Sequence, residues 1–151
     1  MILADTNILL RLAQPAHPHF RPATEAVNLL SAQAGQAIGI ATQSLYEMYV
    51  VLTRPVDVNG FGWSPDQAQT ELRRAISFFQ LFPETDSIYQ HWEDLVVRYN
   101  VVGKSAHDAR LVALMNASHM DRLLTFNDRD FSRFAEITVI NPFDVLGLPR
   151  A

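Results

Sequence analysis

Short apolar runs alternate along the chain with longer segments in which apolar residues recur every three or four positions. Runs of strand size occur at 2–4, 36–41, 123–124 and 137–140. The segments with helical spacing predict helices at 21–34, 42–52, 65–79, 85–99 and 105–119, with a brief extended piece at 80–83. This alternation of strands and helices predicts an α/β domain with a mostly parallel sheet.

Local signals mark several boundaries between these elements. Closely spaced prolines predict a loop at 15–19, and proline with glycine predicts another at 54–63. The stretch Ser64-Pro65-Asp66-Gln67 is typical of a helix start, because serine can cap the first turn and proline suits its first position. A turn is expected at 141–144, followed by a tail without regular structure.

The composition indicates one ordinary domain. The chain has 151 residues, of which 48% are hydrophobic, and we expect a single domain over 1–146 and a flexible tail over 147–151. The absence of cysteine excludes disulfides and thiolate metal sites. Apolar runs shorter than a membrane span and the lack of a basic leader favour a cytoplasmic protein without a membrane partner.

The net charge of −4 argues against a protein that binds nucleic acid through bulk basicity. However, Lys104 is the only lysine, and every other basic side chain is an arginine. Arginine can contact phosphate or carboxylate groups through two hydrogen bonds at once. Charge alone therefore leaves open a local arginine patch for RNA and arginine pairing with acids inside the fold.

Acidic residues follow or flank the predicted strands. Asp5 ends the first strand, Glu47 lies in the helix after the second, and Asp108 opens the helix before the strand at 123–124. Asp128 and Asp130 follow that strand. Since ligands gather beyond the carboxyl ends of parallel strands, we expect these carboxylates to share one edge of the sheet.

Several carboxylates in one pocket raise each other's pKa values unless a cation compensates their charge. Oxygen ligands without cysteine or a histidine cluster suit Mg²⁺ or Mn²⁺. Such an ion can promote hydrolysis of a phosphodiester. The two histidines of His17-Pro18-His19 have no third ligand in reach along the chain and are weak evidence for a metal site.

Each acid also has a simpler interpretation when it is taken alone. Asp5 could be a solvated turn residue that caps the next helix, whose start the side chains of Thr6 and Asn7 could also cap. Ser44 and Glu47 have the spacing of a capping box, and Asp108 sits where an acid would stabilise a helix N-terminus. Four capping acids at one sheet edge would nevertheless be hard to explain as caps.

Taken in order, four short motifs resemble the acidic motifs of PIN domains, and the closing Val139-Ile140-Asn141-Pro142 is similar to the end of those domains. The resemblance covers nearly the whole chain and is closest to VapC-type toxins of bacterial toxin–antitoxin pairs. The four motifs are Asp5-Thr6-Asn7-Ile8-Leu9, Ser44-Leu45-Tyr46-Glu47, His107-Asp108-Ala109-Arg110-Leu111 and Leu124-Thr125-Phe126-Asn127 with Asp130-Phe131.

The resemblance implies a three-layer α/β/α sandwich and a metal-dependent endoribonuclease. Asp5, Glu47 and Asp108 match three acidic positions of the family. At the fourth position Asn127 replaces an aspartate, and the acid stands three residues later at Asp130. These four carboxylates are the predicted catalytic residues and ligands of Mg²⁺ or Mn²⁺.

Neighbouring polar residues and basic residues receive supporting roles in the same interpretation. Thr6, Asn7, Thr125 and Asn127 would orient ligands or waters around the metal, whereas Asp128 receives no role beyond a solvated loop. The basic residues expected to contact RNA are Arg11, Lys104, Arg110 and Arg129, although Arg110 could equally pair with an acid.

The resemblance also implies partners. These are an RNA substrate, tRNA among the candidates, and a cognate antitoxin whose C-terminal segment lies across the groove. A second copy of the chain is a further expected partner, with the helices between 64 and 100 as the plausible surface.

Two other functions compete with the ribonuclease. Loss of a carboxylate at Asn127 is compatible with a PIN-like module that binds RNA or protein without cleaving RNA. A metal-dependent phosphatase is a third possibility, but Asp5-Thr6-Asn7 lacks the second aspartate expected there, and no phosphate loop is evident.

Overall fold

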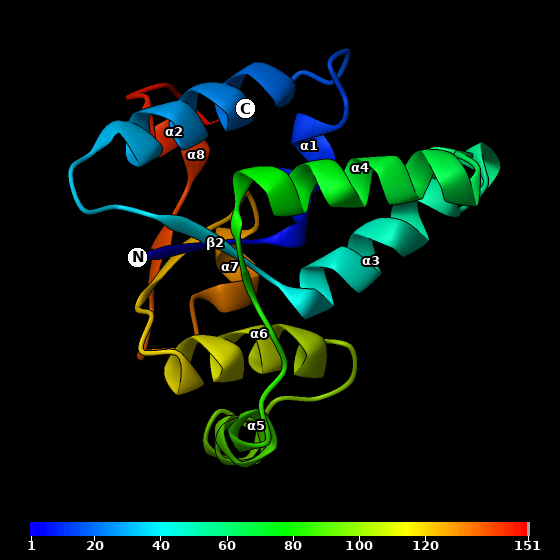
Figure 1. Ribbon diagram of the computed structural model, residues 1–151. Helices are drawn as coiled ribbons and strands as arrows, with labels where there is room; N and C mark the ends of the chain where they lie inside the picture. Colours follow the sequence, from blue (N-terminus) through cyan, green and yellow to red (C-terminus); the bar gives the residue numbers. More distant parts are fainter. Residues whose placement is uncertain (151) are drawn as a thin grey trace.

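The computed structural model describes residues 1–150 and places their strands in one sheet between helices (Figure 1). In chain order the elements are β1 (Ile2–Ala4), α1 (Thr6–Leu12), α2 (Phe20–Ala32), β2 (Ile38–Ala41), α3 (Thr42–Thr53), η1 (Val56–Val58), α4 (Pro65–Phe78), β3 (Gln80–Phe82), α5 (Ser87–Arg98), α6 (Ser105–Ala117), β4 (Arg122–Leu124), α7 (Asp128–Phe131), β5 (Thr138–Ile140) and α8 (Pro142–Val145).

The strands form a sheet in the order β3-β2-β1-β4-β5, and every neighbouring pair is parallel. The first strand in the sequence, β1, is therefore the central strand of the sheet. Its last residue, Ala4, is in register with Ile40 of β2 and Leu124 of β4. The carboxyl ends of the three middle strands consequently lie side by side, and the predicted α/β fold with a parallel sheet is confirmed.

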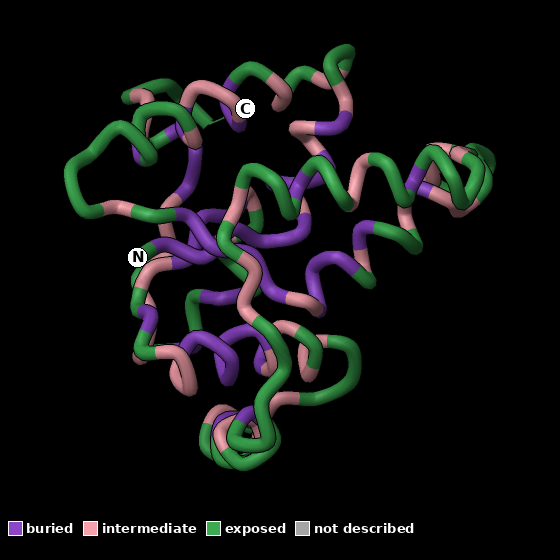
Figure 2. The backbone as a smooth tube through the Cα atoms, in the orientation of Figure 1, coloured by how far each residue is buried: buried purple, intermediate pink, exposed green. Residues whose placement is uncertain are grey.

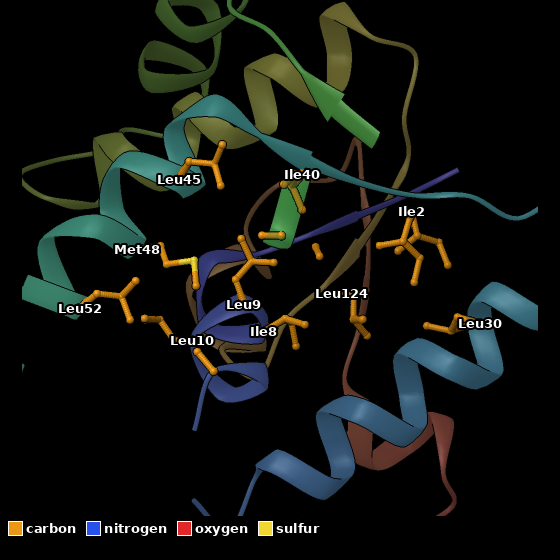
Figure 3. Close-up of a cluster of buried hydrophobic side chains, with 14 of the residues drawn as sticks. Ile2, Ile8, Leu9, Leu10, Leu30, Ile40, Leu45, Met48, Leu52 and Leu124 are labelled. Carbon is orange, nitrogen blue, oxygen red and sulfur yellow. The ribbon is translucent and has the colours of Figure 1, made fainter. Parts of the chain in front are cut away.

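Alternate strand residues face two separate apolar cores, which makes the domain three-layered. Ile2 and Ala4 point into a core with α1, α2, α3 and α4. Figure 3 shows Ile8 and Leu9 of α1 in this core. Leu3 points the other way, into a core with α5 and α6. Figure 2 shows the buried middle of this arrangement, where β1 and β2 lie, flanked by helices with exposed outer turns. The α/β/α sandwich implied by the resemblance is present.

Local chemistry accounts for several element boundaries. The Ser64 hydroxyl accepts a hydrogen bond from the Gln67 N–H at 3.2 Å while the Gln67 side chain accepts from the Ser64 N–H at 2.9 Å, so the predicted capping box is confirmed. In β2, Gly39 leaves room for the ring of Phe82 on β3, since a β-carbon at Gly39 would lie 2.5 Å from that ring.

Some sequence expectations were wrong in detail. Helical spacing over 21–34 places Ala26, Leu29, Leu30 and Gln33 on one side, but Leu29 is 51% exposed, because Ala23, Ala26 and Leu30 are the residues that face the core. The turn expected at 141–144 is the short helix α8, which Asn141 caps by accepting from the Phe143 N–H at 3.0 Å. A second short helix, α7, was not expected.

Residue 151 of the expected tail 147–151 lies outside the described residues. Within the tail, the guanidinium of Arg150 binds the carboxylates of Asp128 and Asp144. Among residues 1–150, the helices are all too short or too polar to cross a lipid bilayer.

Candidate active site

The first candidate residue, Asp5, follows β1 directly and lies in the middle of the carboxyl edge of the sheet. Its backbone N–H donates to the Leu124 carbonyl at 3.0 Å, which extends the β1–β4 pairing by one residue. The Asp5 side chain is only 7% exposed. Because burial penalises a charge, this carboxylate depends on its hydrogen-bond partners.

Three donors hold the Asp5 carboxylate in one orientation. The Thr6 N–H donates to Oδ1 at 2.7 Å, so Asp5 itself caps α1. Asn7 Nδ2 and the Thr125 hydroxyl both donate to Oδ2 at 2.7 Å. The expectation that Asp5 caps the helix is confirmed, although Asp5 is buried and not solvated. The expectation that Thr6 and Asn7 cap it is wrong, because Asn7 is a side-chain donor to Asp5.

The same polar residues join β1 to the loop after β4. Asn7 Nδ2 also donates to the Thr125 hydroxyl at 2.8 Å, and Asn7 Oδ1 accepts from the Phe126 N–H at 3.1 Å. The Asn127 N–H donates to the Thr125 hydroxyl at 3.0 Å. The backbone of the loop at 125–127 is thus held by Asn7 and Thr125.

Glu47 lies on the second turn of α3 and faces Asp5. Its Oε2 accepts from the Thr6 hydroxyl at 2.7 Å, and its Oε1 accepts from Gln43 Nε2 at 2.8 Å. The capping-box interpretation of Ser44 and Glu47 is wrong, because α3 begins at Thr42 and its N-cap is Ala41. Glu47 instead belongs to the group of side chains around Asp5.

Gln43 is a site residue that the sequence interpretation missed. Its side chain is buried, and besides Glu47 it binds the His107 carbonyl on α6 at 2.9 Å. Gln43 Oε1 accepts from Arg110 at 3.0 Å. One amide therefore links the helix of Glu47 to the helix of Asp108. Its spacing of four residues from Glu47 on a helix was the signal that could have identified it.

Asp108 and Asp130 approach from the other side. Asp108 is half-buried and lies in the first turn of α6, near the helix N-terminus as expected. The N-cap of this helix is Lys104, whose side chain makes no capping hydrogen bond. Asp130 lies on α7 and is exposed. The negative charges of both Asp130 and Glu47 act on Asp108, so the structure brings all four predicted carboxylates into one region.

The electrostatics of this region disfavour several negative charges. Burial raises the pKa of Asp5 from 3.8 to about 6, against the hydrogen bonds from Thr125 and Thr6, and the charges of Glu47 and Asp108 add to the increase. Burial also raises the pKa of Asp108 to about 6, with Asp130 and Glu47 adding to it and nearby cationic groups opposing it.

An all-oxygen donor set that resists ionisation fits a hard divalent cation, since such an ion stabilises the ionised carboxylates that burial disfavours. Within residues 1–150, however, no three acidic or histidine side chains converge closely enough to form a ready-made metal cluster. Asp5 and Glu47 are fixed by hydrogen bonds, whereas Asp130 is exposed on a short helix. The donor types therefore fit Mg²⁺ or Mn²⁺, with Asp130 the carboxylate freest to adjust.

The remaining candidate residues have different surroundings. Arg110 binds Gln43 and forms an ion pair with Glu84 at 2.6 Å, and Arg11 binds the side chain of Gln14 at 2.6 Å. Lys104 and Arg129 are exposed. Asp128, interpreted from sequence as a solvated loop residue, accepts from Asn141 Nδ2 at 2.6 Å and pairs with Arg150.

A further cationic residue was missed. The positive charge of Arg133, on the segment after α7, opposes the rise in the pKa of Asp108. No motif singled it out, because its approach to Asp108 depends on how α7 packs against α6.

The PIN domain family model matches residues 2–137, which include all four carboxylates. The chain belongs to the PIN-domain family. No curated protein matches the sequence significantly.

Solved PIN-like structures resemble this chain over nearly their whole length. VapBC2 from Rickettsia felis bound to promoter DNA is 17% identical, with a TM-score of 0.72 over 93% of this chain and 98% of that one. A toxin–antitoxin complex from Klebsiella pneumoniae is 22% identical, with a TM-score of 0.66 over 94% and 98%. VapC20 from Mycobacterium tuberculosis, a toxin that cleaves the sarcin–ricin loop, is 15% identical, with a TM-score of 0.62 over 91% and 98%. At these identities the likeness establishes the shared fold.

Proposed function

We propose that this PIN-domain protein is a Mg²⁺- or Mn²⁺-dependent endoribonuclease and the toxin of a type II toxin–antitoxin pair. The observation that carries the proposal is that Asp5, Glu47, Asp108 and Asp130 lie at the carboxyl edge of a PIN-domain sheet, near enough for their charges to act on neighbouring members of the group. Raised pKa values at Asp5 and Asp108 add support, because a divalent cation would relieve the repulsion that causes part of them.

The residues of the candidate active site would have three roles: holding the ion, positioning its carboxylate ligands, and linking the helices that carry them. Asp5, Glu47, Asp108 and Asp130 would hold the ion, which would polarise a phosphoryl oxygen and make a water more acidic. Thr6 fixes the position of Glu47, and Thr125 with Asn7 fixes that of Asp5. Gln43 holds α3 and α6 at a constant separation, and so keeps Glu47 and Asp108 in place relative to one another.

The partners follow from the same proposal. The solved structures that resemble this chain include toxin–antitoxin complexes and a toxin that cleaves the sarcin–ricin loop, and a similar antitoxin and an RNA substrate are proposed here. Lys104, the N-cap of α6, and Arg129 on α7 are exposed, belong to the same helices as Asp108 and Asp130, and are proposed to contact RNA phosphates. Arg110 and Arg11 are engaged with neighbouring side chains and are weaker candidates. A homodimer in the cytoplasm remains part of the proposal.

Expression in bacterial cells tests the toxin role. Induction of the wild type should arrest growth and produce discrete new RNA ends, while induction of Asp108→Asn at equal soluble level should do neither. Coexpression of a neighbouring antitoxin gene should relieve the arrest. Normal growth and intact RNA in cells that contain folded wild-type protein would contradict the proposal.

A catalytically weak binding module is the second candidate. It is favoured by the lack of three converging metal ligands among residues 1–150 and by Asn127 at a position where the resemblance predicted a carboxylate. Calorimetry with Mn²⁺ separates the two functions. Heat of binding that disappears in Asp5→Asn supports the ribonuclease, and the absence of heat in the wild type supports the binding module.

A further inference from the structure

A cavity of about 360 Å³ opens beside the candidate active site. Its walls come from the loop after β4 and α7, from α8, and from the loop before α2. Two of its residues, Asn127 and Asp130, also belong to the candidate active site, so the cavity and the carboxylates share one wall. Any group bound in the cavity would therefore lie next to an RNA phosphate held at the carboxylates.

Aromatic side chains form one side of this cavity. The rings of His19 and Phe126 are stacked, with centroids 4.6 Å apart and planes 25° from parallel. Phe143 meets both rings edge-on, at 5.2 Å from His19 and 5.8 Å from Phe126. Phe143 is buried, whereas His19 and Phe126 are half-buried. The cavity thus has a rigid aromatic wall supported from behind.

Polar groups with unused hydrogen-bonding capacity form the rim. Among residues 1–150, Asn127 and Arg129 enter hydrogen bonds only through backbone atoms: the Asn127 N–H and carbonyl, and the Arg129 carbonyl. Their amide and guanidinium side chains are exposed and line the cavity. The carboxylate of Asp128 is bound by Asn141 and Arg150, which offsets its repulsion of a phosphate.

We propose that this cavity is a nucleobase subsite, which takes one unpaired base of the RNA next to the cleaved phosphodiester. An aromatic wall can stack on a base, an amide can read its polar edge, and an arginine can contact the adjoining phosphate. This proposal rests on the proposed function, and adds to it the cavity and the residues that would hold the base beside the cleaved bond.

The size of the cavity favours a base over a segment of a protein partner. A flat single base fits a space of this volume, whereas an α-helix with its side chains is about 10 Å across. The mixture of an aromatic wall with both a positive and an amide side chain at the rim is also the combination used for unpaired bases.

The test measures cleavage of a short single-stranded RNA and of the same RNA with an abasic ribose at each position in turn. We expect one abasic position near the cleaved bond to lower kcat/KM about 10- to 100-fold in the wild type, by loss of one stacked base. Phe126→Leu keeps an apolar side chain against the core but removes the ring. This variant should lower kcat/KM on intact RNA by a similar factor. On the abasic RNA its kcat/KM should be little lower than that of the wild type.

Matched variants control for general effects of substitution. His19→Ala and Arg129→Gln should also reduce the difference in kcat/KM between intact and abasic RNA. His91→Ala on α5 and Arg73→Gln on α4 change the same residue types away from the cavity and should leave it unchanged. Circular dichroism and thermal unfolding identify any variant that fails to fold.

A second measurement does not depend on catalysis. In the Asp5→Asn background, fluorescence anisotropy gives the Kd of end-labelled intact and abasic RNAs. Weaker binding of one abasic RNA, with the difference removed by Phe126→Leu, supports the subsite even if no RNA is cleaved and the proposed function fails.

If the wild type cleaves RNA but no abasic position couples to His19 or Phe126, the subsite is wrong and the ribonuclease stands. If binding of intact and abasic RNAs is equal in every variant, the cavity does not hold a base. A cavity that serves a protein partner would give that second result.

Discussion

Replacing Asp5 with asparagine should make the metal-free protein more stable at neutral pH and less stable in acid. The unfolded carboxyl ionises with a pKa near 3.8, whereas burial in the folded protein raises the pKa of Asp5 to about 6. The folded state therefore binds the proton more tightly, and wild-type stability falls as the pH rises from about 4 through 6. At about 1.4 kcal/mol per pH unit, ionisation of Asp5 costs roughly 3 kcal/mol above pH 6.

Asparagine removes this cost but alters the hydrogen bonds. One of the two oxygens becomes an amide nitrogen, which cannot accept a hydrogen bond. At Oδ1 this removes the bond from the Thr6 N–H, and at Oδ2 it disturbs the bonds from Asn7 and Thr125. Loss of one such bond costs about 1 kcal/mol. In EDTA we therefore expect Asp5→Asn to be about 1 kcal/mol less stable than wild type near pH 4. Near pH 7.5 it should be about 2 kcal/mol more stable.

Urea unfolding followed by tryptophan fluorescence measures both differences. The control is Asp57→Asn, an exposed carboxylate in η1, for which the stability difference from wild type should not vary with pH in this way. Adding Mg²⁺ should stabilise the wild type and not Asp5→Asn. A stability difference for Asp5→Asn that is the same at both pH values would refute the proposed burial cost.

Three further predictions follow from the same contacts. The affinity for Mn²⁺ should weaken as the pH falls below about 6, because protons then occupy the carboxyl groups of Asp5 and Asp108, whose pKa values are raised. Calorimetry in buffers of different ionisation heat should detect proton release on binding, and a constant affinity from pH 5 to 8 would contradict this. Gln43→Ala should lower cleavage about 10- to 100-fold while the fold persists, because Glu47 loses a donor that holds it, and unchanged kcat would show that Gln43 does not position the site. Gly39→Ala should cost about 1–3 kcal/mol in urea unfolding, because its β-carbon would collide with Phe82, and a neutral effect would show that this ring moves freely.

The sequence was sufficient to predict the sheet and the region of the site, because both follow from short-range patterns. Short apolar runs separated by helical periods can form few structures other than a parallel α/β sheet. Once the strands are parallel, residues that follow β1 and β4 must meet at one edge, which is why Asp5 and Thr125 come together.

What the sequence could not supply depends on packing between distant elements. Gln43 reaches across to α6, and Arg133 approaches Asp108 only through the placement of α7. Likewise, Ser44 and Glu47 have the spacing of a capping box, but pairing of β2 with β1 sets the start of α3 three residues earlier than that box requires. The cavity beside His19 combines residues from distant parts of the chain and has no signature in any one of them.

The most direct test of the central claim is cleavage of RNA by purified, antitoxin-free protein in Mg²⁺, Mn²⁺ and EDTA, with Asp5→Asn prepared in parallel to detect contaminating nuclease. Total RNA and a tRNA pool serve as substrates. The account predicts discrete fragments that require the divalent ion and are absent with Asp5→Asn. Equal cleavage by the folded Asp5→Asn variant, or no cleavage by the wild type in either metal, would contradict it.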